Sequence, residues 1–150
     1  MENIDPSQAA RVWQRVRGNQ TDDPEQLLAQ LIAQEWEDAS IYLQLSRRTG
    51  GKEAAALYQL FQQEQAHCSC LKGIYTLTTG KKPAIPAVKK IAEPMEIALR
   101  HCYGREMRCL SAYEQRREDP QYGHVFARLA QQEQEHCRVV LELIGSGAKG

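Results

Sequence analysis

This chain carries two copies of one motif, Glu-Gln-Ala-His-Cys at residues 64–68 and Glu-Gln-Glu-His-Cys at residues 133–137. On a helix, the first and fourth residues of the motif lie on the same face, so a carboxylate and an imidazole can reach one cation. A lone glutamate, with a tyrosine seven residues after it, precedes each copy: Glu35 with Tyr42, and Glu106 with Tyr113. Two Glu-x-x-His pairs and two further glutamates are the ligand set of a dinuclear metal site.

The spacing of these residues indicates a duplicated helical hairpin. The interval from Glu35 to Glu64 is almost the same as the interval from Glu106 to Glu133. The two halves are therefore related by a nearly constant offset along the chain, whether it is measured at the first glutamate or at the second. Such regular spacing argues against a chance occurrence of the motif.

The composition narrows the class of protein. A chain of 150 residues fits one domain with its own core. The 19 basic and 19 acidic residues balance, so neither nucleic acid nor an anionic membrane is expected as a partner. No apolar run approaches the roughly 20 residues of a transmembrane helix, and residues 1–20 lack the apolar segment of a signal peptide. We therefore expect a soluble, cytoplasmic protein.

Helix start and stop signals predict an all-α fold. Asp5-Pro6 begins a short extra helix that runs to about Val16, within an N-terminal extension of residues 1–22. Cap residues, prolines and glycines then predict four helices, at about 23–48, 53–79, 94–118 and 120–144. These helices form one bundle domain, residues 23–145, and a disordered tail is expected over residues 146–150.

The lengths of the links predict how the four helices connect. Residues 80–90 contain Pro83 and Pro86 and are expected to be extended, whereas the first and third links are short. Two helical hairpins joined by a long crossover follow from this pattern. Eleven to thirteen extended residues reach roughly 35–45 Å, and a 25-residue helix is about 38 Å long. The crossover can therefore carry the chain back along the bundle.

Helical wheels place the candidate ligands toward the core. Glu35, Glu64, Glu106 and Glu133 point inward at one level near mid-bundle, His67 and His136 lie about 60° to the side of the nearest glutamate, and Glu37 is expected at the surface. The alternative is that all six are surface residues of ordinary amphipathic helices. Four carboxylates in an apolar interior would repel one another, and two divalent ions would neutralise them. Oxygen ligands with one imidazole per metal suit iron or manganese.

The order Glu, Glu-x-x-His, Glu, Glu-x-x-His resembles that of the ferritin-like di-iron carboxylate proteins over about residues 23–145. The spacing from glutamate to tyrosine most resembles that of the rubrerythrins. This resemblance implies a ferritin-like four-helix bundle that holds two iron ions, with manganese as the alternative metal. It also implies a reaction in which hydrogen peroxide is reduced, or ferrous iron is oxidised by oxygen or peroxide.

The resemblance further assigns a role to each candidate residue. The bridging ligands would be Glu64 and Glu133, and the terminal ligands would be Glu35 with His67 on one metal and Glu106 with His136 on the other. Tyr42 and Tyr113 would be hydrogen-bond donors that hold the glutamates, although plain core aromatics fit the same positions.

Two departures from the rubrerythrin pattern affect the expected chemistry. Rubrerythrins carry an additional glutamate one turn beyond the helix-3 ligand, and Cys109 occupies that position here. They also append a rubredoxin domain with C-x-x-C pairs, and none of the five cysteines forms such a pair. We therefore expect that electrons come from a separate electron-donor protein, or that turnover is ferroxidase-like. A non-catalytic iron-binding or storage subunit and a di-metal hydroxylase acting on an organic substrate remain alternatives.

The remaining residues of interest are expected to be structural. Cys68 and Cys137 directly follow the ligand histidines but should pack as small apolar groups. His101 and His124 are expected to face solvent. Trp36 at the edge of the core and Ile41 outside it could pack under the N-terminal segment or against a second subunit. Together with Trp13 they are the best indications of assembly, and we expect a homodimer.

Overall fold

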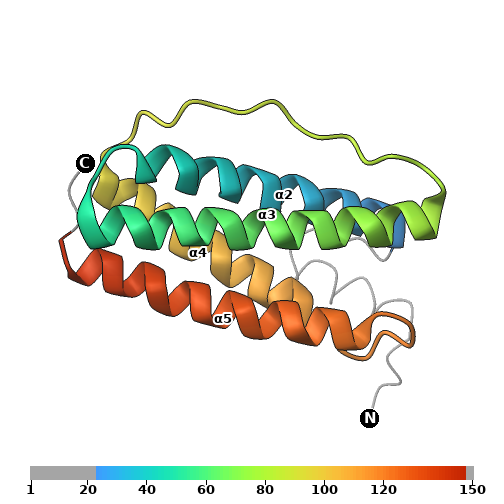
Figure 1. The fold of residues 1–150 in the computed structure, drawn as a ribbon. Helices are drawn as coiled ribbons and strands as arrows, with labels where there is room; N and C mark the ends of the chain where they lie inside the picture. The colour runs from blue at the N-terminus through green and yellow to red at the C-terminus, as the bar shows by residue number, and fades with distance from the viewer. Residues whose placement is uncertain (1–22, 148–150) are drawn as a thin grey trace, which may run out of the picture.

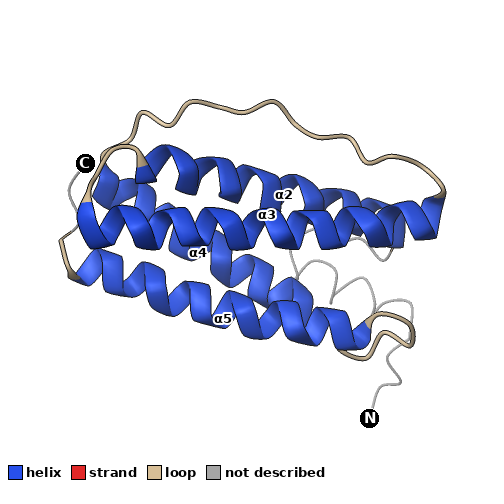
Figure 2. Cartoon of the chain, viewed as in Figure 1, coloured by secondary structure: helices blue, strands red, loops and turns tan. Residues whose placement is uncertain are grey.

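The computed structural model describes residues 23–147, which form four helices and contain no strand (Figures 1 and 2). The helices are α2 (Pro24–Ser46), α3 (Gly51–Thr79), α4 (Met95–Glu114) and α5 (Gly123–Gly145). The predicted all-α class is confirmed, and the arrangement is consistent with a four-helix bundle. The N-terminal extension 1–22 with its predicted short helix, Trp13, and residues 148–150 of the predicted tail lie outside the described residues. None of the four helices has the length and apolar character needed to cross a membrane.

Two of the predicted boundary signals act as expected. The Asp23 carboxylate accepts a hydrogen bond of 3.1 Å from the Glu25 N–H, and Pro24 is the first residue of α2. At the other end of the first hairpin, Gly80 adopts a left-handed conformation with φ of 72° and donates its N–H to the Thr76 oxygen at 2.8 Å. Glycine reaches this conformation without a steric cost, so α3 ends there.

The second hairpin turn is longer than the sequence predicts. α4 ends at Glu114 instead of about residue 118, and α5 begins at Gly123 instead of directly after Asp119-Pro120. The Asp119 carboxylate accepts the N–H groups of Gln121 and Tyr122, at 2.9 and 2.7 Å, and the Gly123 N–H donates to the Asp119 backbone oxygen at 2.9 Å. Asp119 therefore caps one separate turn, and α5 begins only after it. Gly123 then passes so close to Arg117 that an added Cβ would lie 2.3 Å from the Arg117 carbonyl oxygen. Only glycine fits at this position.

The two helices within each hairpin pack against each other in the same way. α2 lies against α3, and α4 lies against α5, along their lengths. Between the hairpins, α2 contacts α4 and α3 contacts α5. Neighbouring helices run in opposite directions, because the crossover returns the chain to the end of the bundle at which α3 began (Figure 1).

The crossover, residues 80–94, runs outside α2 along the bundle, as predicted (Figure 1). The Trp36 indole N–H donates to the Pro86 oxygen at 3.1 Å. Further along α2, the Gln44 side chain donates to the Lys89 oxygen and accepts the Ile91 N–H, each at 2.8 Å. Trp36 therefore holds the crossover against α2, so this residue has a structural role within its own chain.

The position of Ile41 was predicted wrongly. Instead of lying outside the core, it is buried, because the start of α4 covers this part of α2: Ile41 belongs to one apolar cluster with Met95 and Leu99. A homodimer therefore stays a prediction that neither Trp36 nor Ile41 supports.

The core consists of two apolar clusters, one toward each end of the bundle. The first is built from buried residues of all four helices, including Leu28, Leu31, Leu71, Tyr113 and Phe126. The second is built in the same way, and includes Ile41, Leu45, Leu57, Leu99 and Val140. The four glutamates lie in the sequence between the residues that each helix gives to the two clusters. A polar layer therefore sits between two apolar ones.

Replacing Gly123 by alanine should destabilise the protein by about 1–3 kcal/mol, because the new Cβ would collide with the Arg117 backbone. Gly73 is the matched control, since it lies on the exposed face of α3 with nothing within 4 Å of an added Cβ. Gly73→Ala should stabilise by about 0.5–1 kcal/mol through helix propensity. Urea unfolding measures both changes, and equal effects of the two substitutions would contradict this account of the turn.

Candidate metal centre

The structure brings all six predicted ligands together in the middle of the bundle. The four glutamates are completely buried, and the two histidines are 3% and 1% exposed. They come from every helix: Glu35 from α2, Glu64 and His67 from α3, Glu106 from α4, and Glu133 and His136 from α5. The alternative, that these residues are surface groups, is wrong.

Around each histidine, carboxylate oxygens gather at the Nδ1 atom. Nδ1 of His67 lies 2.8 Å from Glu133 Oε1, 3.4 Å from Glu35 Oε2 and 3.7 Å from Glu64 Oε2. We call this group of atoms the first position. Nδ1 of His136 lies 2.6 Å from Glu64 Oε1, 3.5 Å from Glu106 Oε2 and 3.9 Å from Glu133 Oε1, and this is the second position.

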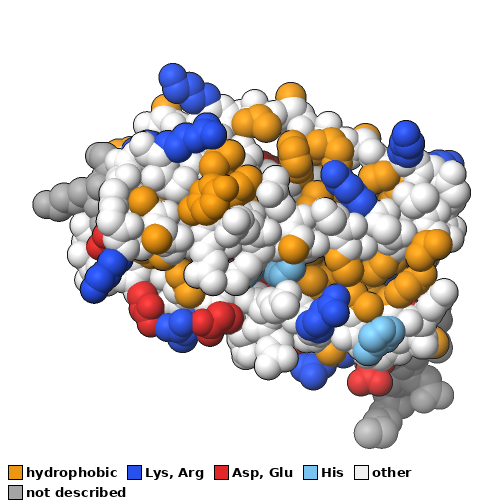
Figure 3. Space-filling model, viewed as in Figure 1, with side chains coloured by type: hydrophobic (Ala, Val, Ile, Leu, Met, Phe, Trp, Pro, Cys, Tyr) orange, Lys and Arg blue, Asp and Glu red, His pale blue; other side chains and the backbone are white. Residues whose placement is uncertain are grey.

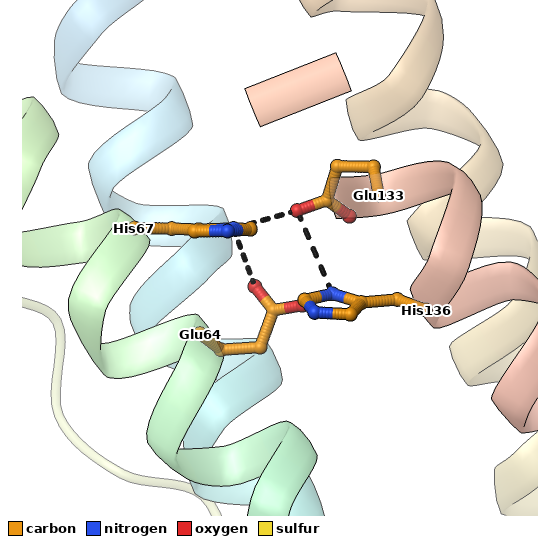
Figure 4. A group of neighbouring side chains, drawn as sticks. All are labelled: Glu64, His67, Glu133 and His136. Atoms are coloured by element: carbon orange, nitrogen blue, oxygen red, sulfur yellow. Dashed lines mark hydrogen bonds and ion pairs between the residues drawn. The ribbon is translucent and has the colours of Figure 1, made fainter. Parts of the chain in front are cut away.

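The two positions are adjacent and face each other across the hairpins. The His67 and His136 rings stack, with centroids 5.2 Å apart and an interplanar angle of 19°. Figure 4 shows the rings entering from opposite sides, with the Glu64 and Glu133 carboxylates between them. Each histidine therefore makes its shortest carboxylate contact with the motif glutamate of the other hairpin.

One oxygen of each of the four glutamates, Oε2, is buried without a hydrogen-bond partner among residues 23–147. A buried, unpaired carboxylate oxygen is costly, so proteins rarely leave one without a ligand. Here four occur together, beside imidazole nitrogens. One ligand atom each from Glu64, His67, Glu133 and His136 lie within 4.8 Å of one another. This cluster can hold a metal ion, and its donor atoms fit the metal pair that the sequence predicts.

The same crowding shifts the acidities of the glutamates in opposite directions. Burial, followed by the neighbouring carboxylates, raises the pKa of Glu64 and of Glu133 well above the usual value. Burial also opposes ionisation of Glu35 and Glu106, but contacts with the other glutamates and with the histidines outweigh it. These contacts lower the pKa of Glu35 and bring that of Glu106 to about 2. Without a cation, the cluster therefore keeps protons on Glu64 and Glu133.

Both predicted tyrosines contact the glutamates of the opposite hairpin. The Tyr42 hydroxyl donates to Glu106 Oε1, and the Tyr113 hydroxyl donates to Glu35 Oε1, each at 2.7 Å. Burial is the main cause that raises the pKa of both tyrosines, so the hydroxyls stay protonated as donors. This geometry favours the predicted role in orienting glutamates over that of a plain core aromatic.

Two glutamines complete the cluster, and the sequence interpretation missed them. Nε2 of His67 lies 2.6 Å from the Gln132 side-chain oxygen, and Nε2 of His136 lies 2.7 Å from that of Gln63. An amide oxygen can only accept, so Nε2 carries the proton and Nδ1 is left free to bind a cation. The sequence contains a signal that could have identified both glutamines, since each directly precedes a motif glutamate.

The glutamines also mark the side on which the cluster is closest to solvent. Gln63 and Gln132 are exposed, although the histidines beneath them are buried. Figure 3, which views the molecule from the side of α3 and α5, shows histidine atoms at the surface between these two helices. An exposed glutamine therefore contacts each buried histidine on this face.

A buried ion pair beside the cluster was also missed. Asp38 is 3% exposed, and its Oδ1 accepts a hydrogen bond from Arg105 Nε. Arg105 also pairs with Glu37 at 3.3 Å, and Glu37 lies near the surface as predicted. Asp38 follows Glu35 by three residues, the spacing of the Glu-x-x-His pairs, which is the signal that could have identified it.

The residues predicted to be structural behave as expected. All five cysteines are free thiols. Cys68 is buried with its sulfur 3.7 Å from the Ile32 oxygen, and Cys137 packs with its sulfur 3.6 Å from that of Met107. Burial raises the pKa of Cys137 to about 11. His101 and His124 are exposed.

A scan against protein-family models and a search of curated proteins gave no match to this chain.

The metal-free protein should become less stable as the pH rises from 5 to 8. Above the ordinary pKa of 4.5, the unfolded chain has released the protons that Glu64 and Glu133 keep when folded. The unfolded state then binds fewer protons, and each retained proton costs up to about 1.4 kcal/mol per pH unit. The raised pKa of His67 acts in the same direction above 6.5. Thermal unfolding in the presence of a chelator measures the slope, and a flat or rising melting temperature would contradict the buried protons.

The double variant Glu64→Gln/Glu133→Gln should lose the part of this pH dependence that Glu64 and Glu133 cause, because neutral amides replace both groups, and should become nearly flat between pH 5 and 6.5, below the ordinary pKa of His67. Its metal-free form should be at least as stable as the parent at pH 8, and divalent metal should no longer raise its melting temperature. Glu37→Gln, which removes a carboxylate near the surface of α2, is the control and should retain both properties of the parent.

Replacing Gln63 or Gln132 by leucine should weaken metal binding by about 10–100-fold, because the histidine loses the acceptor that fixes its tautomer. The exposed neighbours Gln62 and Gln131 provide matched controls, since Gln62→Leu and Gln131→Leu leave that acceptor in place. Isothermal titration with Mn²⁺ or Co²⁺ gives the affinities. Equal affinities in all four variants would show that the glutamines do not position the histidines.

Proposed function

We propose that this protein is a rubrerythrin-like, non-haem di-iron oxidoreductase that reduces hydrogen peroxide, oxidises ferrous iron, or does both. The observation that carries the proposal is the group of four buried glutamates with unpartnered oxygens, each beside a histidine nitrogen. The order of these residues along the chain, which resembles that of ferritin-like proteins, supports the same conclusion.

The distances support the proposed division between bridging and terminal ligands. Glu64 lies within 3.7 Å of His67 Nδ1 and 2.6 Å of His136 Nδ1, and Glu133 lies within 2.8 and 3.9 Å of the same two atoms. Both glutamates thus face both positions, as bridging ligands must. Glu35 is paired with His67 alone and Glu106 with His136 alone, as expected for terminal ligands.

Charge and donor type support iron as the metal. Four glutamates neutralise two divalent ions, and a set of oxygens with one imidazole per ion suits iron or manganese better than zinc. Two ferrous ions bound there would supply the two electrons that, together with two protons from solvent, convert hydrogen peroxide to two waters. Manganese takes the same ligands, so the supply of metal decides between the two elements.

The side chains around the proposed metals have roles of their own. Tyr42 and Tyr113 hold the two terminal glutamates by donated hydrogen bonds, and Gln63 and Gln132 hold the histidines. The apolar clusters on either side would limit water, and peroxide or oxygen would enter on the face between α3 and α5, where the exposed glutamines contact the histidines. The reducing electrons would come from a separate donor protein.

Stopped-flow mixing tests the proposal directly. Protein loaded anaerobically with about two ferrous ions per chain should be oxidised by peroxide or oxygen within seconds, with about two irons oxidised per peroxide. The Glu64→Gln/Glu133→Gln variant should show no such rapid oxidation of iron, and the Glu37→Gln control should react like the parent. Failure of both oxidants would eliminate the enzymatic function. Binding of many more than two irons per chain would favour the storage alternative.

A further inference from the structure

We propose that Asp38 is a seventh ligand, which serves the second position only, so that the two metals occupy chemically different sites. This inference rests on the proposed dinuclear centre. It concerns one carboxylate that the duplicated motif does not supply.

The Asp38 carboxylate is buried and has one oxygen to spare. Its Oδ1 is bound by Arg105, but Oδ2 is buried without a hydrogen-bond partner among residues 23–147. A structural ion pair would leave Oδ2 unsatisfied, at a cost. This oxygen has the same character as the Oε2 atoms of the four glutamates.

The position of Asp38 assigns it to one metal. One oxygen each from Asp38, Glu64 and Glu106 lie within 4.8 Å of one another. Oxygens bound to one divalent ion at about 2.0–2.2 Å lie up to ~4.4 Å apart, so a small adjustment lets all three contact the same ion. Glu64 and Glu106 both face His136, and the ion is therefore the one in the second position.

Charge balance allows Asp38 to remain ionised there. The cluster would contain five carboxylates, and two divalent ions with the Arg105 guanidinium supply five positive charges. Arg105 is thus a positioning residue that fixes Asp38 from the outside, while the second oxygen stays available.

The equivalent place in the other hairpin holds a thiol. Cys109 lies as far along the chain from Asp38 as Glu106 lies from Glu35. It is buried, and its sulfur lies within 4.8 Å of ligand atoms of Glu35 and Glu133. Gln34 occupies the place equivalent to Arg105, so no guanidinium occurs there. The first position is therefore poorer in oxygen, and the second should favour harder cations.

Titration of the full-length protein with Co²⁺, followed by its visible absorption, tests the assignment. In a His67→Ala background, which disables the first position, Asp38→Asn should weaken the remaining Co²⁺ site at least tenfold. In a His136→Ala background the same substitution should change affinity by less than about threefold. Circular dichroism and the melting temperature of each metal-free variant verify folding without reference to activity.

Two controls separate ligation from support of Arg105. Glu37→Gln removes the other carboxylate partner of Arg105 and should leave both sites unchanged. Should Asp38→Asn fail to fold, Asp38→Asn/Arg105→Gln removes both charges of the ion pair and should show the same selective loss of the second site. Equal effects of Asp38→Asn in the two histidine backgrounds, or no effect in either, would overturn the proposal while the dinuclear site stands. A parent protein that binds no Co²⁺ would overturn both.

Discussion

The structure depends on the placement of four carboxylates in one layer of an apolar interior. Such a layer is unfavourable by itself, because desolvation and mutual repulsion oppose ionisation of every member. The metal-free protein tolerates it by keeping protons on Glu64 and Glu133, whereas contacts with these two glutamates and with the histidines stabilise Glu35 and Glu106 as anions. Any cation that enters must displace those protons, so metal binding and acidity are coupled in this fold.

The same layer joins the two hairpins. Contacts within each hairpin are extensive, but contacts between hairpins are fewer. The strongest polar contacts of the centre all run between hairpins: Tyr42 to Glu106, Tyr113 to Glu35, His67 to Glu133 and Gln132, and His136 to Glu64 and Gln63. Loss of a ligand therefore affects the docking of the hairpins as well as the metal.

The sequence predicted those parts of the structure that local rules govern. Helix starts and stops at Asp23 and Gly80 follow from hydrogen bonds within a few residues, and the inward direction of the glutamates follows from helical period. The same cap signal misled at Asp119, because its carboxylate caps one separate turn and α5 begins only at Gly123. Gln63 and Gln132 were not predicted as part of the site. A helical wheel places them at the exposed edge, but their partners lie on the other hairpin.

Asp38 and Cys109 show where the duplication has been broken. Wherever both copies retain the same residue type, as at the glutamates, tyrosines, histidines and glutamines, the contacts are mirrored almost atom for atom. Asp38, held by Arg105, lies beside the second position, and the Cys109 thiol lies beside the first. The two otherwise equivalent positions would therefore have different donor atoms. A reaction in which two metals cycle between oxidation states gains from such a difference, because the position richer in oxygen stabilises the more highly charged ion. The departure from symmetry would thus determine which of the two positions holds the more highly charged ion.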